Sequence, residues 1–408
     1  MLKGRFTTRR TCRLCNSSML HLFLNMGLMP LAGDFLKKKD IGKEKLYPLR
    51  IFFCENCFLV QLLDIVKDSN IFKDYRYFSS VSLSRHFGDY AQEISTKFLK
   101  KGSFVVEIGS NDGVLLGPFK KRGYRVLGVD PAKNATKEAN KKGLKTITDY
   151  FGIKSSKRIL EEYGQADAIF ANNVLAHIDN MEDVAKGIEI LLKDDGIFVF
   201  EVHYLGNLIK DLQYDFFYPG EHLTYYSLYP LMLFWKKYGI KIFDIKKTKI
   251  HSGSIRVYAS KKSRKKSNIE KFLNEEKKLG LYKKNTFDKF ATQVFKNKSL
   301  LEKNIKDLAK KGKIVGYGAA GRANTLLNYS NITDRAITYI VDESSQRQGR
   351  FTPGNHIEIF PVSKFKNDNP KFCMILAWSY ADEIMKKEKE FKENGGKFVV
   401  PLPKFVVK

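Results

Sequence analysis

Four of the five cysteines form two Cys-x-x-Cys pairs, a spacing that could bind a metal ion. The first pair is Cys12 and Cys15, and the second is Cys54 and Cys57. Each pair places two thiolates on one tight turn, and two turns complete the tetrahedral four-sulfur shell that Zn²⁺ prefers. A cytoplasmic chain keeps few disulfides, which favours zinc over the alternative of four buried or redox-active thiols. Because four thiolates leave no open coordination position, we expect a structural zinc ion.

A second chemical pattern is the segment EIGSNDG (107–113), which follows an apolar run and precedes a helical one. Gly109 lets the backbone turn tightly beside a ligand, and Glu107 offers a carboxylate to a cationic amine. Asp130 ends the next strand-like run, where an acid is placed for ribose hydroxyls. Further polar candidates in this loop and at the following strand ends are Asn111, Asp149, Asn172 and Asn173.

These side chains together predict a binding site for S-adenosylmethionine (SAM), the methyl donor of methyltransferases. Glu107 would meet the amino-acid end, Asp130 the ribose, and the later carboxylate and amides the adenine. One glycine motif is a weak indication, whereas four polar strand ends in the right order are a stronger one. The alternative is an α/β fold that carries acids at these positions by coincidence.

The elements that must position this site alternate between strand and helix. Strand-like runs cover 104–108, 124–129, 166–171 and 197–202, and helical spacing covers 113–122, 132–142, 153–164 and 181–193. This alternation predicts a parallel sheet with helices on both faces. Open sheets of this kind bind ligands at the carboxyl ends of their strands, where the polar candidates fall.

A second, smaller α/β unit is predicted near the C-terminus. Gly316, Gly318 and Gly321 form a GxGxxG motif between a strand-like run and a helical one, and Asp342 ends the next strand. Alone, this motif suggests NAD(P) binding, although a degenerate Rossmann unit has the same residues. A highly charged stretch with apolar residues at helical spacing precedes it. The expected units are a zinc-binding domain (1–70), a SAM-dependent methyltransferase domain (71–262), a helical connector (263–311) and a Rossmann-like domain (312–408).

The composition limits the classes of partner. The net charge of +28, from 72 basic and 44 acidic residues, indicates either a polyanionic partner or a lysine-rich solvated surface. The second interpretation is favoured because no stretch interleaves arginines with aromatic residues. No run approaches the ~20 apolar residues of a membrane span, and no signal peptide precedes the first cysteines. We expect a cytoplasmic protein with no membrane partner, and a nucleic-acid partner is disfavoured.

Several longer segments resemble those of NDP-sugar C-methyltransferases. They are YxYFSSxS (75–82), AxNVLAHI (171–178), EVxYLxxLI (201–209), GEHLTYYSL (220–228, the GEH segment), HSGSIRVY (251–258), GYGAAGRANTLLNY (316–329), VDESSQRQGRFTPGNHI (341–357) and AWSYADEI (377–384). The resemblance is collinear and covers essentially the whole chain. It implies a class I SAM-dependent methyltransferase domain between a small zinc-binding domain and a smaller Rossmann-like domain. It also implies methylation of a ring carbon, usually C3, on a nucleotide-linked 4-keto sugar.

The same resemblance implies the catalytic residues. A carbon beside a ketone loses its proton to give an enolate, and a positioned histidine can remove that proton near neutral pH. By resemblance, His222 is the base, assisted by Glu221, with Tyr218 and Tyr77 near the reacting sugar. Similar proteins read Tyr-x-Glu-His, whereas this chain has one more residue between the tyrosine and the glutamate. The extra residue could move Tyr218 away from the site.

The remaining candidates concern the substrate. Arg256 lies in a segment that resembles the family's substrate strand, and Arg322 and Arg350 are candidate neighbours of the nucleotide-sugar phosphates. His86 is a candidate for lining the cleft, and His177 for a structural role or a place beside the cofactor. Two alternative functions stay open: an RNA methyltransferase, and a non-catalytic or NAD(P)-dependent protein that binds a sugar nucleotide.

Overall fold

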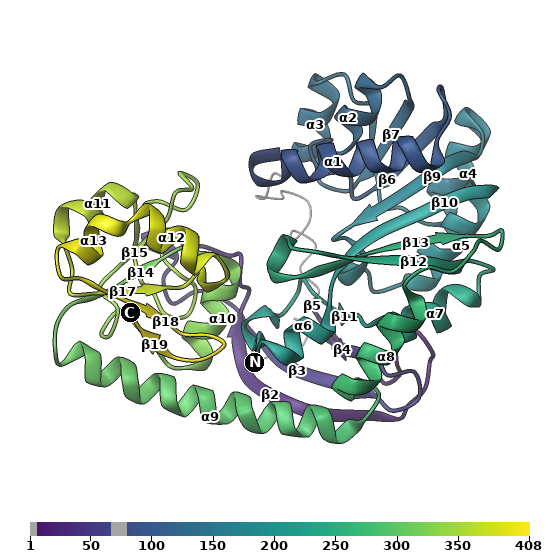
Figure 1. Cartoon of the computed structure of the whole chain (residues 1–408). Coiled ribbons are helices and arrows are strands. Elements are labelled where there is room, and N and C mark those ends of the chain that lie inside the picture. Colours follow the sequence, from purple (N-terminus) through teal and green to yellow (C-terminus); the bar gives the residue numbers. More distant parts are fainter. Residues whose placement is uncertain (1–5, 67–79) are drawn as a thin grey trace.

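The protein is built on three β-sheets of four or more strands, and one long helix runs beneath them (Figure 1). This structure is a computed structural model and describes residues 6–66 and 80–408. One lobe carries the predicted cofactor segment, the other lobe is C-terminal, and the N-terminal sheet lies low between them (Figure 1). Across the described residues, no helix has the length and apolar character needed to cross a bilayer.

The largest sheet has seven strands in the order β12-β13-β10-β9-β6-β7-β8. These strands are β6 (Phe104–Ile108), β7 (Arg125–Asp130), β8 (Thr146–Thr148), β9 (Ala166–Asn172), β10 (Leu192–His203), β12 (Lys241–Thr248) and β13 (Ser254–Ser260). From β8 to β10 all neighbours pair in parallel, whereas β13 runs antiparallel to both β10 and β12. This arrangement is that of a class I methyltransferase sheet and confirms the predicted fold class.

Helices cover both faces of this sheet because consecutive strand residues point to opposite sides. In β6, Phe104, Val106 and Ile108 belong to one buried cluster and Val105 belongs to another. The helices α1, α2 and α3 pack on one face, and α4, α5 and α7 pack on the other. Their bounds, with that of the short α6, are α1 (Ser80–Phe98), α2 (Leu116–Lys121), α3 (Lys133–Lys141), α4 (Ile153–Tyr163), α5 (Met181–Leu191), α6 (Leu205–Lys210) and α7 (Leu228–Lys236).

The N-terminal unit is built on an antiparallel sheet with the order β11-β4-β3-β2. Its own strands are β2 (Leu20–Pro30), β3 (Leu46–Cys54) and β4 (Val60–Leu62), and β1 (Phe6–Thr8) pairs separately with β5 (Asp64–Val66). Burial alternates along β3, as in a strand with one face on a core. The fourth strand, β11 (Thr224–Tyr225), belongs to the GEH segment. The predicted catalytic segment therefore contributes a strand to the sheet of another unit, and the unit boundaries stay a prediction.

Two helices follow the seven-stranded sheet, α8 (Ile269–Leu279) and the 26-residue α9 (Lys284–Ala309). The apolar positions that predicted an amphipathic helix are buried in α9, among them Phe287, Val294 and Leu301. The Phe287 ring stacks on Phe53 of β3, with 4.5 Å between the ring centroids. In Figure 1, α9 runs under the N-terminal sheet from α8 to the C-terminal lobe. It therefore joins two lobes by packing on a third unit.

The C-terminal lobe has a six-stranded sheet in the order β16-β15-β14-β17-β18-β19. Its elements are β14 (Ile314–Tyr317), α10 (Gly321–Tyr329), β15 (Ile340–Val341), β16 (Ile359–Phe360), α11 (Val362–Asp368), β17 (Phe372–Ile375), α12 (Ala381–Lys387), α13 (Lys389–Glu393), β18 (Lys397–Val400) and β19 (Val406–Val407). Short 3-10 helices complete the fold: η1 (Lys38–Asp40), η2 (Leu175–His177), η3 (Tyr214–Phe216), η4 (Ile250–Ser252) and η5 (Trp378–Tyr380). The strand, glycine turn and helix predicted at the start of this unit are present as β14 and α10.

The contact between α9 and the N-terminal sheet yields a stability prediction. We expect Phe287→Ala to lower the free energy of unfolding by about 3–5 kcal/mol, because it removes a fully buried ring and leaves a cavity. Phe295 lies on the same helix and is 49% exposed, so Phe295→Ala is the matched control, with an expected change within about 0.5 kcal/mol. Urea denaturation measures both. Equal destabilisation of the two variants would contradict this packing.

Candidate active site

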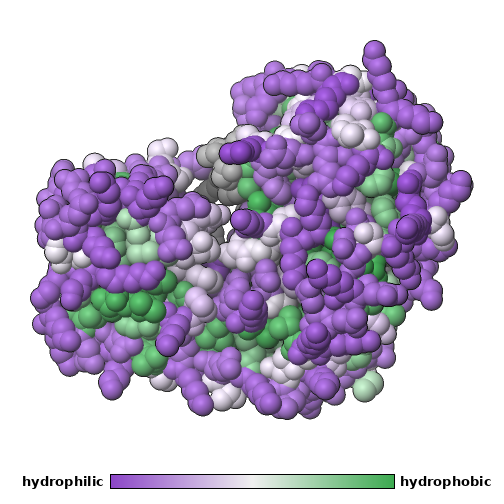
Figure 2. All heavy atoms as spheres, in the orientation of Figure 1, coloured by the Kyte–Doolittle hydropathy of each residue, from purple (hydrophilic) through white to green (hydrophobic). Residues whose placement is uncertain are grey.

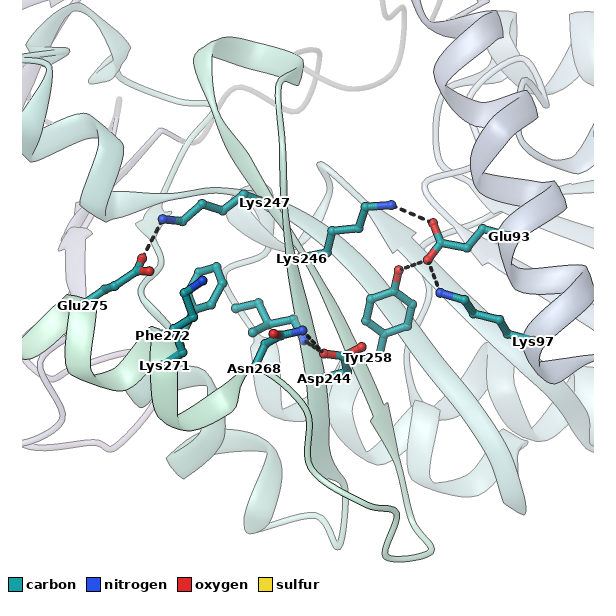
Figure 3. Close-up of a pocket in the computed structure, with 11 residues that line it drawn as sticks. Glu93, Lys97, Asp244, Lys246, Lys247, Tyr258, Asn268, Lys271, Phe272 and Glu275 are labelled. Carbon is teal, nitrogen blue, oxygen red and sulfur yellow. Dashed lines mark hydrogen bonds and ion pairs between the residues drawn. The ribbon is translucent and has the colours of Figure 1, made fainter.

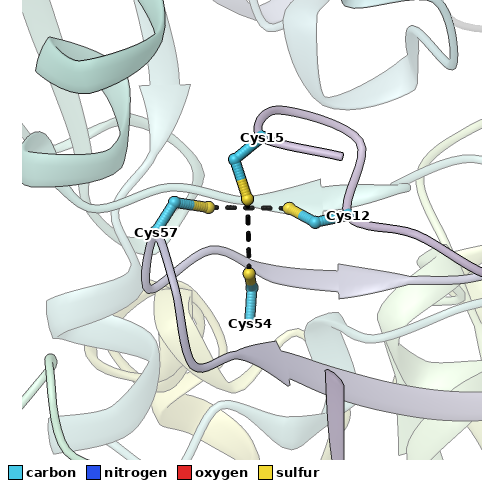
Figure 4. A group of neighbouring side chains, drawn as sticks. All are labelled: Cys12, Cys15, Cys54 and Cys57. Carbon is cyan, nitrogen blue, oxygen red and sulfur yellow. Dashed lines mark hydrogen bonds between the residues drawn. The ribbon is translucent and has the colours of Figure 1, made fainter. Parts of the chain in front are cut away.

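The four cysteines of the two pairs meet at one point (Figure 4). Their sulfur atoms all lie within 4.8 Å of one another. The sulfur atoms of Cys12 and Cys57 are 3.5 Å apart, and those of Cys15 and Cys54 are 3.6 Å apart. Four sulfurs at ~2.3 Å from a tetrahedral Zn²⁺ would stand about 3.8 Å from each other. The donor set therefore fits a structural zinc ion.

The two cysteine turns repeat the same backbone geometry. Asn16 follows the first pair with a φ of 59°, and Phe58 follows the second with a φ of 65°. The N–H of Asn16 donates to the Cys12 carbonyl at 2.9 Å, and the N–H of Phe58 donates to the Cys54 carbonyl at 2.8 Å. Left-handed residues close each turn, so that both sulfurs of a pair point to the same side. The local chain is thus shaped for metal binding at both turns.

The predicted cofactor residues gather at the carboxyl ends of β6, β7 and β9. Glu107 is buried at the end of β6, and the side-chain amide of Asn172 donates to it at 3.4 Å. Among the described residues, the second carboxylate oxygen of Glu107 and the amide oxygen of Asn172 are buried without a hydrogen-bond partner. Burial raises the pKa of Glu107 well above its usual value. Buried polar atoms left in this state indicate that a polar ligand completes the site.

The glycine loop after β6 is held by Asp130 at the end of β7. The Asp130 carboxylate accepts the backbone N–H groups of Asn111 at 2.9 Å and Ala132 at 2.8 Å. Gly109 has a φ of +65°, and a Cβ added there would stand 2.7 Å from the Val174 side chain. Only glycine satisfies both constraints. The loop therefore keeps its backbone close to the strand ends where a ligand would lie.

Asp149 and Asn173 lie at the same edge of the sheet but in different surroundings. Asp149 follows β8, and its half-exposed carboxylate pairs with Arg158 at 3.2 Å. Asn173 follows β9 with a φ of 55°, and its N–H donates to the carbonyl of Glu201 at 2.8 Å. Asp130 is only 7% exposed, so its carboxylate is much better shielded from water than that of Asp149.

The GEH segment is held between the seven-stranded sheet and the N-terminal sheet. The N–H of Leu223 donates to the Ala176 carbonyl at 2.7 Å, and its own carbonyl accepts the N–H of Leu62 at 2.9 Å. The ring Nδ1–H of His177 donates to the Glu221 carbonyl at 2.7 Å. His177, for which the sequence suggested either a structural role or a place beside the cofactor, thus fixes the backbone of Glu221.

Tyr218 stays beside His222 despite the extra residue in the motif. Its hydroxyl lies 3.3 Å from the His222 Nε2, and the two ring centroids are 4.7 Å apart. Gly220 has a φ of +87°, which lets the chain turn back between the two side chains. The inserted residue therefore does not separate this pair. Tyr77 lies outside the described residues.

His222 lies within a group of histidines. Burial, followed by the positive charges available on His177, His203, His251 and Arg322, lowers its pKa well below the usual range. The rings of His177 and His222 are 4.8 Å apart. His222 is consequently neutral near pH 7, so one imidazole nitrogen carries no proton, which is the state a proton acceptor needs.

Sequence reasoning missed the residues that support His222 from behind. The Phe216 ring lies 5.0 Å from that of His222 and stacks on His203 at 3.8 Å. The His203 Nε2 lies 3.1 Å from the side-chain oxygen of Gln213, and burial lowers the His203 pKa to about 3. Two sequence signals touch this layer: Phe216 lies in the aromatic run that ends at Tyr218, and His203 lies within the 201–209 segment that resembles the family. Neither signal identifies a contact with His222.

Glu221 is directed toward the N-terminal unit rather than toward His222. Its Oε1 lies 3.2 Å from the position that a Cβ on Gly33 would take. No described side chain makes a hydrogen bond to this carboxylate, and burial raises its pKa to about 7. The group is therefore balanced between its neutral and ionised forms near neutral pH.

Arg256 is buried in a charged network under α1. Its Nε donates to Glu201 at 2.8 Å and its Nη1 donates to Glu93 at 3.2 Å. The guanidinium lies over the Tyr90 ring, 3.4 Å from the centroid. His86, a cleft candidate, lies 2.9 Å from Glu201 in the same network. These contacts give Arg256 and His86 a role in fixing α1 on the sheet.

Arg322 connects the C-terminal lobe to the layer behind His222. Its guanidinium forms a bidentate pair with the buried Asp215, at 3.1 Å and 3.0 Å, and contacts the hydroxyl of Ser252. The Trp378 indole N–H also donates to Asp215, at 2.8 Å. Ser252 has a φ of 65°, a strained conformation that these contacts stabilise. Each of the three guanidinium nitrogens of Arg322 thus donates to a partner within the protein, which favours positioning over phosphate binding.

The C-terminal glycine turn packs on the N-terminal unit. Gly321 faces Ala32, with 3.6 Å between an added Cβ and the Ala32 Cβ, and Asn324 donates to the Ala32 carbonyl. Asp342 accepts the N–H of Ala319 at 2.7 Å. Arg350 is partly exposed and donates weakly to the Phe35 carbonyl at 3.4 Å. The helix start that would meet a dinucleotide pyrophosphate is therefore covered by the N-terminal unit.

Two surface features bear on substrate access. Figure 2 shows the surface hollowed between the two lobes, with mostly hydrophilic residues along its borders. A separate hollow of about 430 Å³ lies beside the β12–β13 hairpin (Figure 3). Three of its four lysines are paired: Lys97 and Lys246 with Glu93, each at 3.0 Å, and Lys247 with Glu275 at 2.6 Å. The charges within this second hollow are thus largely neutralised.

Comparisons with known proteins agree with this arrangement. Three family models match in order: a zinc binding domain over residues 12–72, a methyltransferase domain over 82–244 and a C-methyltransferase C-terminal domain over 249–403. C-methyltransferase NovU from Streptomyces niveus is 33% identical over 400 residues, which cover 96% of this chain and 95% of NovU.

Solved structures give partial likenesses. Magnesium protoporphyrin IX methyltransferase (ChlM) from Synechocystis PCC 6803 with bound SAM is 14% identical, covers 44% of this chain and 79% of its own, and has a TM-score of 0.33. A SAM-dependent methyltransferase from Clostridium acetobutylicum ATCC 824 is 16% identical, covers 43% and 91%, and has a TM-score of 0.35. The family assignment rests on the models and on NovU: this chain belongs to the family of C-methyltransferases that includes NovU, and it is a SAM-dependent methyltransferase with a zinc-binding domain.

Proposed function

We propose that this enzyme methylates a ring carbon of a nucleotide-linked 4-keto-deoxysugar. The observation that carries the proposal is the pairing of His222 with the Tyr218 hydroxyl, 3.3 Å away, in a segment held between η2 and the N-terminal sheet. A C-methyltransferase needs a carbon nucleophile, and a carbon beside a ketone becomes one only when a base removes its proton. The sugar class comes from the resemblance of the motifs around these residues.

The proposed mechanism divides the work among the residues of this chain. SAM, when bound, supplies an electrophilic methyl group. Glu107, Asp130 and Asn172 would bind it at the strand ends, using the polar atoms that the fold leaves buried. His222 would accept the proton from the sugar carbon at its imidazole, and the Tyr218 hydroxyl would donate to the enolate oxygen that forms.

Glu221 would set the charge of the cleft during proton removal. When His222 accepts a proton it becomes an imidazolium in a buried site, and a nearby carboxylate stabilises that charge. The Glu221 carboxylate points toward Gly33 of the N-terminal unit rather than toward the imidazole, so it would act on this charge from a distance, and no described side chain hydrogen-bonds to it. The Arg322 and Asp215 pair would act one step further away, by holding Phe216 behind the imidazole.

The cofactor assignment is tested at two carboxylates of the same sheet edge. We expect Asp130→Asn to weaken SAM binding about 10- to 100-fold, because a buried charged hydrogen-bond acceptor is worth roughly 1.5–3 kcal/mol. Asp149→Asn is the matched control and should change the affinity less than about threefold. Titration calorimetry measures both dissociation constants. A larger loss for Asp149→Asn would reverse the assignment.

The base assignment is tested at His222. We expect His222→Asn to reduce methyl transfer on the order of 10²- to 10⁴-fold while SAM affinity stays within about twofold. Turnover is followed by mass spectrometry with a panel of NDP-4-keto-sugars, in which the sugar that serves as substrate would gain the mass of one CH2 unit. The control is His21→Asn. His21 lies on β2 of the N-terminal unit and pairs with Asp288 of α9. Wild-type turnover by His222→Asn, or methylation of RNA but of no sugar, would exclude the proposal.

The pH dependence is tested at Glu221. Its pKa of about 7 means that the carboxylate is ionised above neutrality and protonated below it, whereas His222 is neutral throughout. We therefore expect kcat/KM to rise from about pH 6 to about pH 8. In Glu221→Gln the rate should be lower and this rise should disappear. If kcat/KM of Glu221→Gln rose over the same pH range with an unchanged midpoint, the titration would belong to another group.

A further inference from the structure

Arg13 lies inside the first cysteine turn, between Cys12 and Cys15, yet its side chain does not extend into solvent. Its side chain is fully buried, with an exposed fraction of 0%. Burying a guanidinium is costly unless every charge and donor has a defined partner. Its Nε and Nη1 have partners, whereas its Nη2 is buried with no described hydrogen-bond partner, so this arginine needs a reason beyond the folding of a four-cysteine turn.

The guanidinium reaches three separate parts of the molecule. Its Nε donates to the Asp179 carboxylate at 3.0 Å, just beyond η2 of the methyltransferase lobe. Its Nη1 donates to the Leu62 carbonyl of β4 at 3.0 Å and to the Leu223 carbonyl at 3.3 Å. The backbone N–H of Arg13 also donates to the side chain of Gln61 at 3.1 Å. One side chain thus joins the metal turn, the N-terminal sheet and the GEH segment.

Leu223 is the residue directly after His222, so its peptide group determines where the imidazole lies. The peptide that joins these two residues is fixed on the methyltransferase side, because the Leu223 N–H donates to the Ala176 carbonyl at 2.7 Å. On the N-terminal side the Leu223 carbonyl, which belongs to the next peptide, accepts both the Leu62 N–H, at 2.9 Å, and the Arg13 guanidinium. Arg13 is the part of this support that is attached directly to the metal turn.

We infer that Arg13 is a positioning residue for the base: it transmits the geometry of the zinc-bound cysteine turn to Leu223, the residue that follows His222. The inference rests on the proposed role of His222. The zinc ion then acts on activity through structure. Arg13 lies between Cys12 and Cys15, and the position of its Cα is fixed when both of these thiolates bind the metal. A lysine cannot reproduce the effect, since it lacks the planar fork that meets Asp179 and the carbonyls in two directions.

The test compares Arg13→Gln with Arg9→Gln in the full-length, zinc-loaded enzyme. Arg9 pairs with the same Asp179 carboxylate, at 3.2 Å, and makes no described contact with Leu223, so it is the matched control. In Arg13→Gln we expect one zinc per chain to be retained and the SAM dissociation constant to stay within about twofold. Amide exchange at residues 223–225 should be faster, and exchange elsewhere in the methyltransferase lobe should be unchanged.

The kinetic readout separates positioning from stability. We expect kcat of Arg13→Gln to fall on the order of 10- to 100-fold, because a small displacement of a catalytic group is enough for such a loss, with KM for the sugar nearly constant. Arg13→Lys should recover only part of kcat, and Arg9→Gln should behave as wild type. Chelation of zinc from the wild type should produce the same faster exchange at 223–225.

Two outcomes would overturn the inference. In the first, Arg13→Gln keeps wild-type kcat and wild-type exchange at 223–225. In the second, it loses zinc, and exchange accelerates over the whole chain, which would make Arg13 a folding residue. If His222→Asn proved active, the proposed base would fail, but zinc content and exchange at 223–225 would still decide the role of Arg13.

Discussion

The pairing of β11 with β4 is the interaction on which the rest of the site depends. Two residues of the GEH segment, Thr224 and Tyr225, pair with Gln61 and Val60 of the N-terminal sheet. So short a strand has little stability of its own, and the structure supports it on one side with η2 and on the other with β4. The proposed base therefore lies at a seam between units. Its position is defined only when the zinc-binding unit and the methyltransferase unit are both folded and in contact.

The two Rossmann-like units share one local device and use it differently. Asp130 accepts an N–H from the glycine loop of the first unit, and Asp342 accepts the N–H of Ala319 in the second, at 2.9 Å and 2.7 Å. In the first unit, buried polar atoms of Glu107 and Asn172 are left for a ligand. In the second, Ala32 packs against the start of α10. The same strand, turn and acid can thus form a cofactor site or a docking surface, depending on what lies opposite.

Much of this could be predicted from the sequence because it is local. Alternating apolar residues predicted the strands, spacing predicted the four-sulfur cluster, and the glycine turns predicted two α/β units. The β11–β4 pairing was not predictable, since its partners lie more than 160 residues apart and a two-residue strand has no periodicity. The arginine interpretations also depended on non-local partners: Arg322 finds Asp215, and Arg256 finds Glu201, so that charges which look available in the sequence are already paired in the fold.

The zinc-binding unit contacts both lobes, and this explains why a methyltransferase would carry it. Leu36 bridges to Phe351, and Glu44 binds His356 and the N–H of Gly354 in the C-terminal lobe. Arg13 binds Asp179 in the methyltransferase lobe. If one lobe binds SAM and the sugar lies between the lobes, the relative position of base and methyl group depends on the lobe arrangement. A third unit, stiffened by a metal and attached to both lobes, holds that arrangement while it carries the strand next to the base.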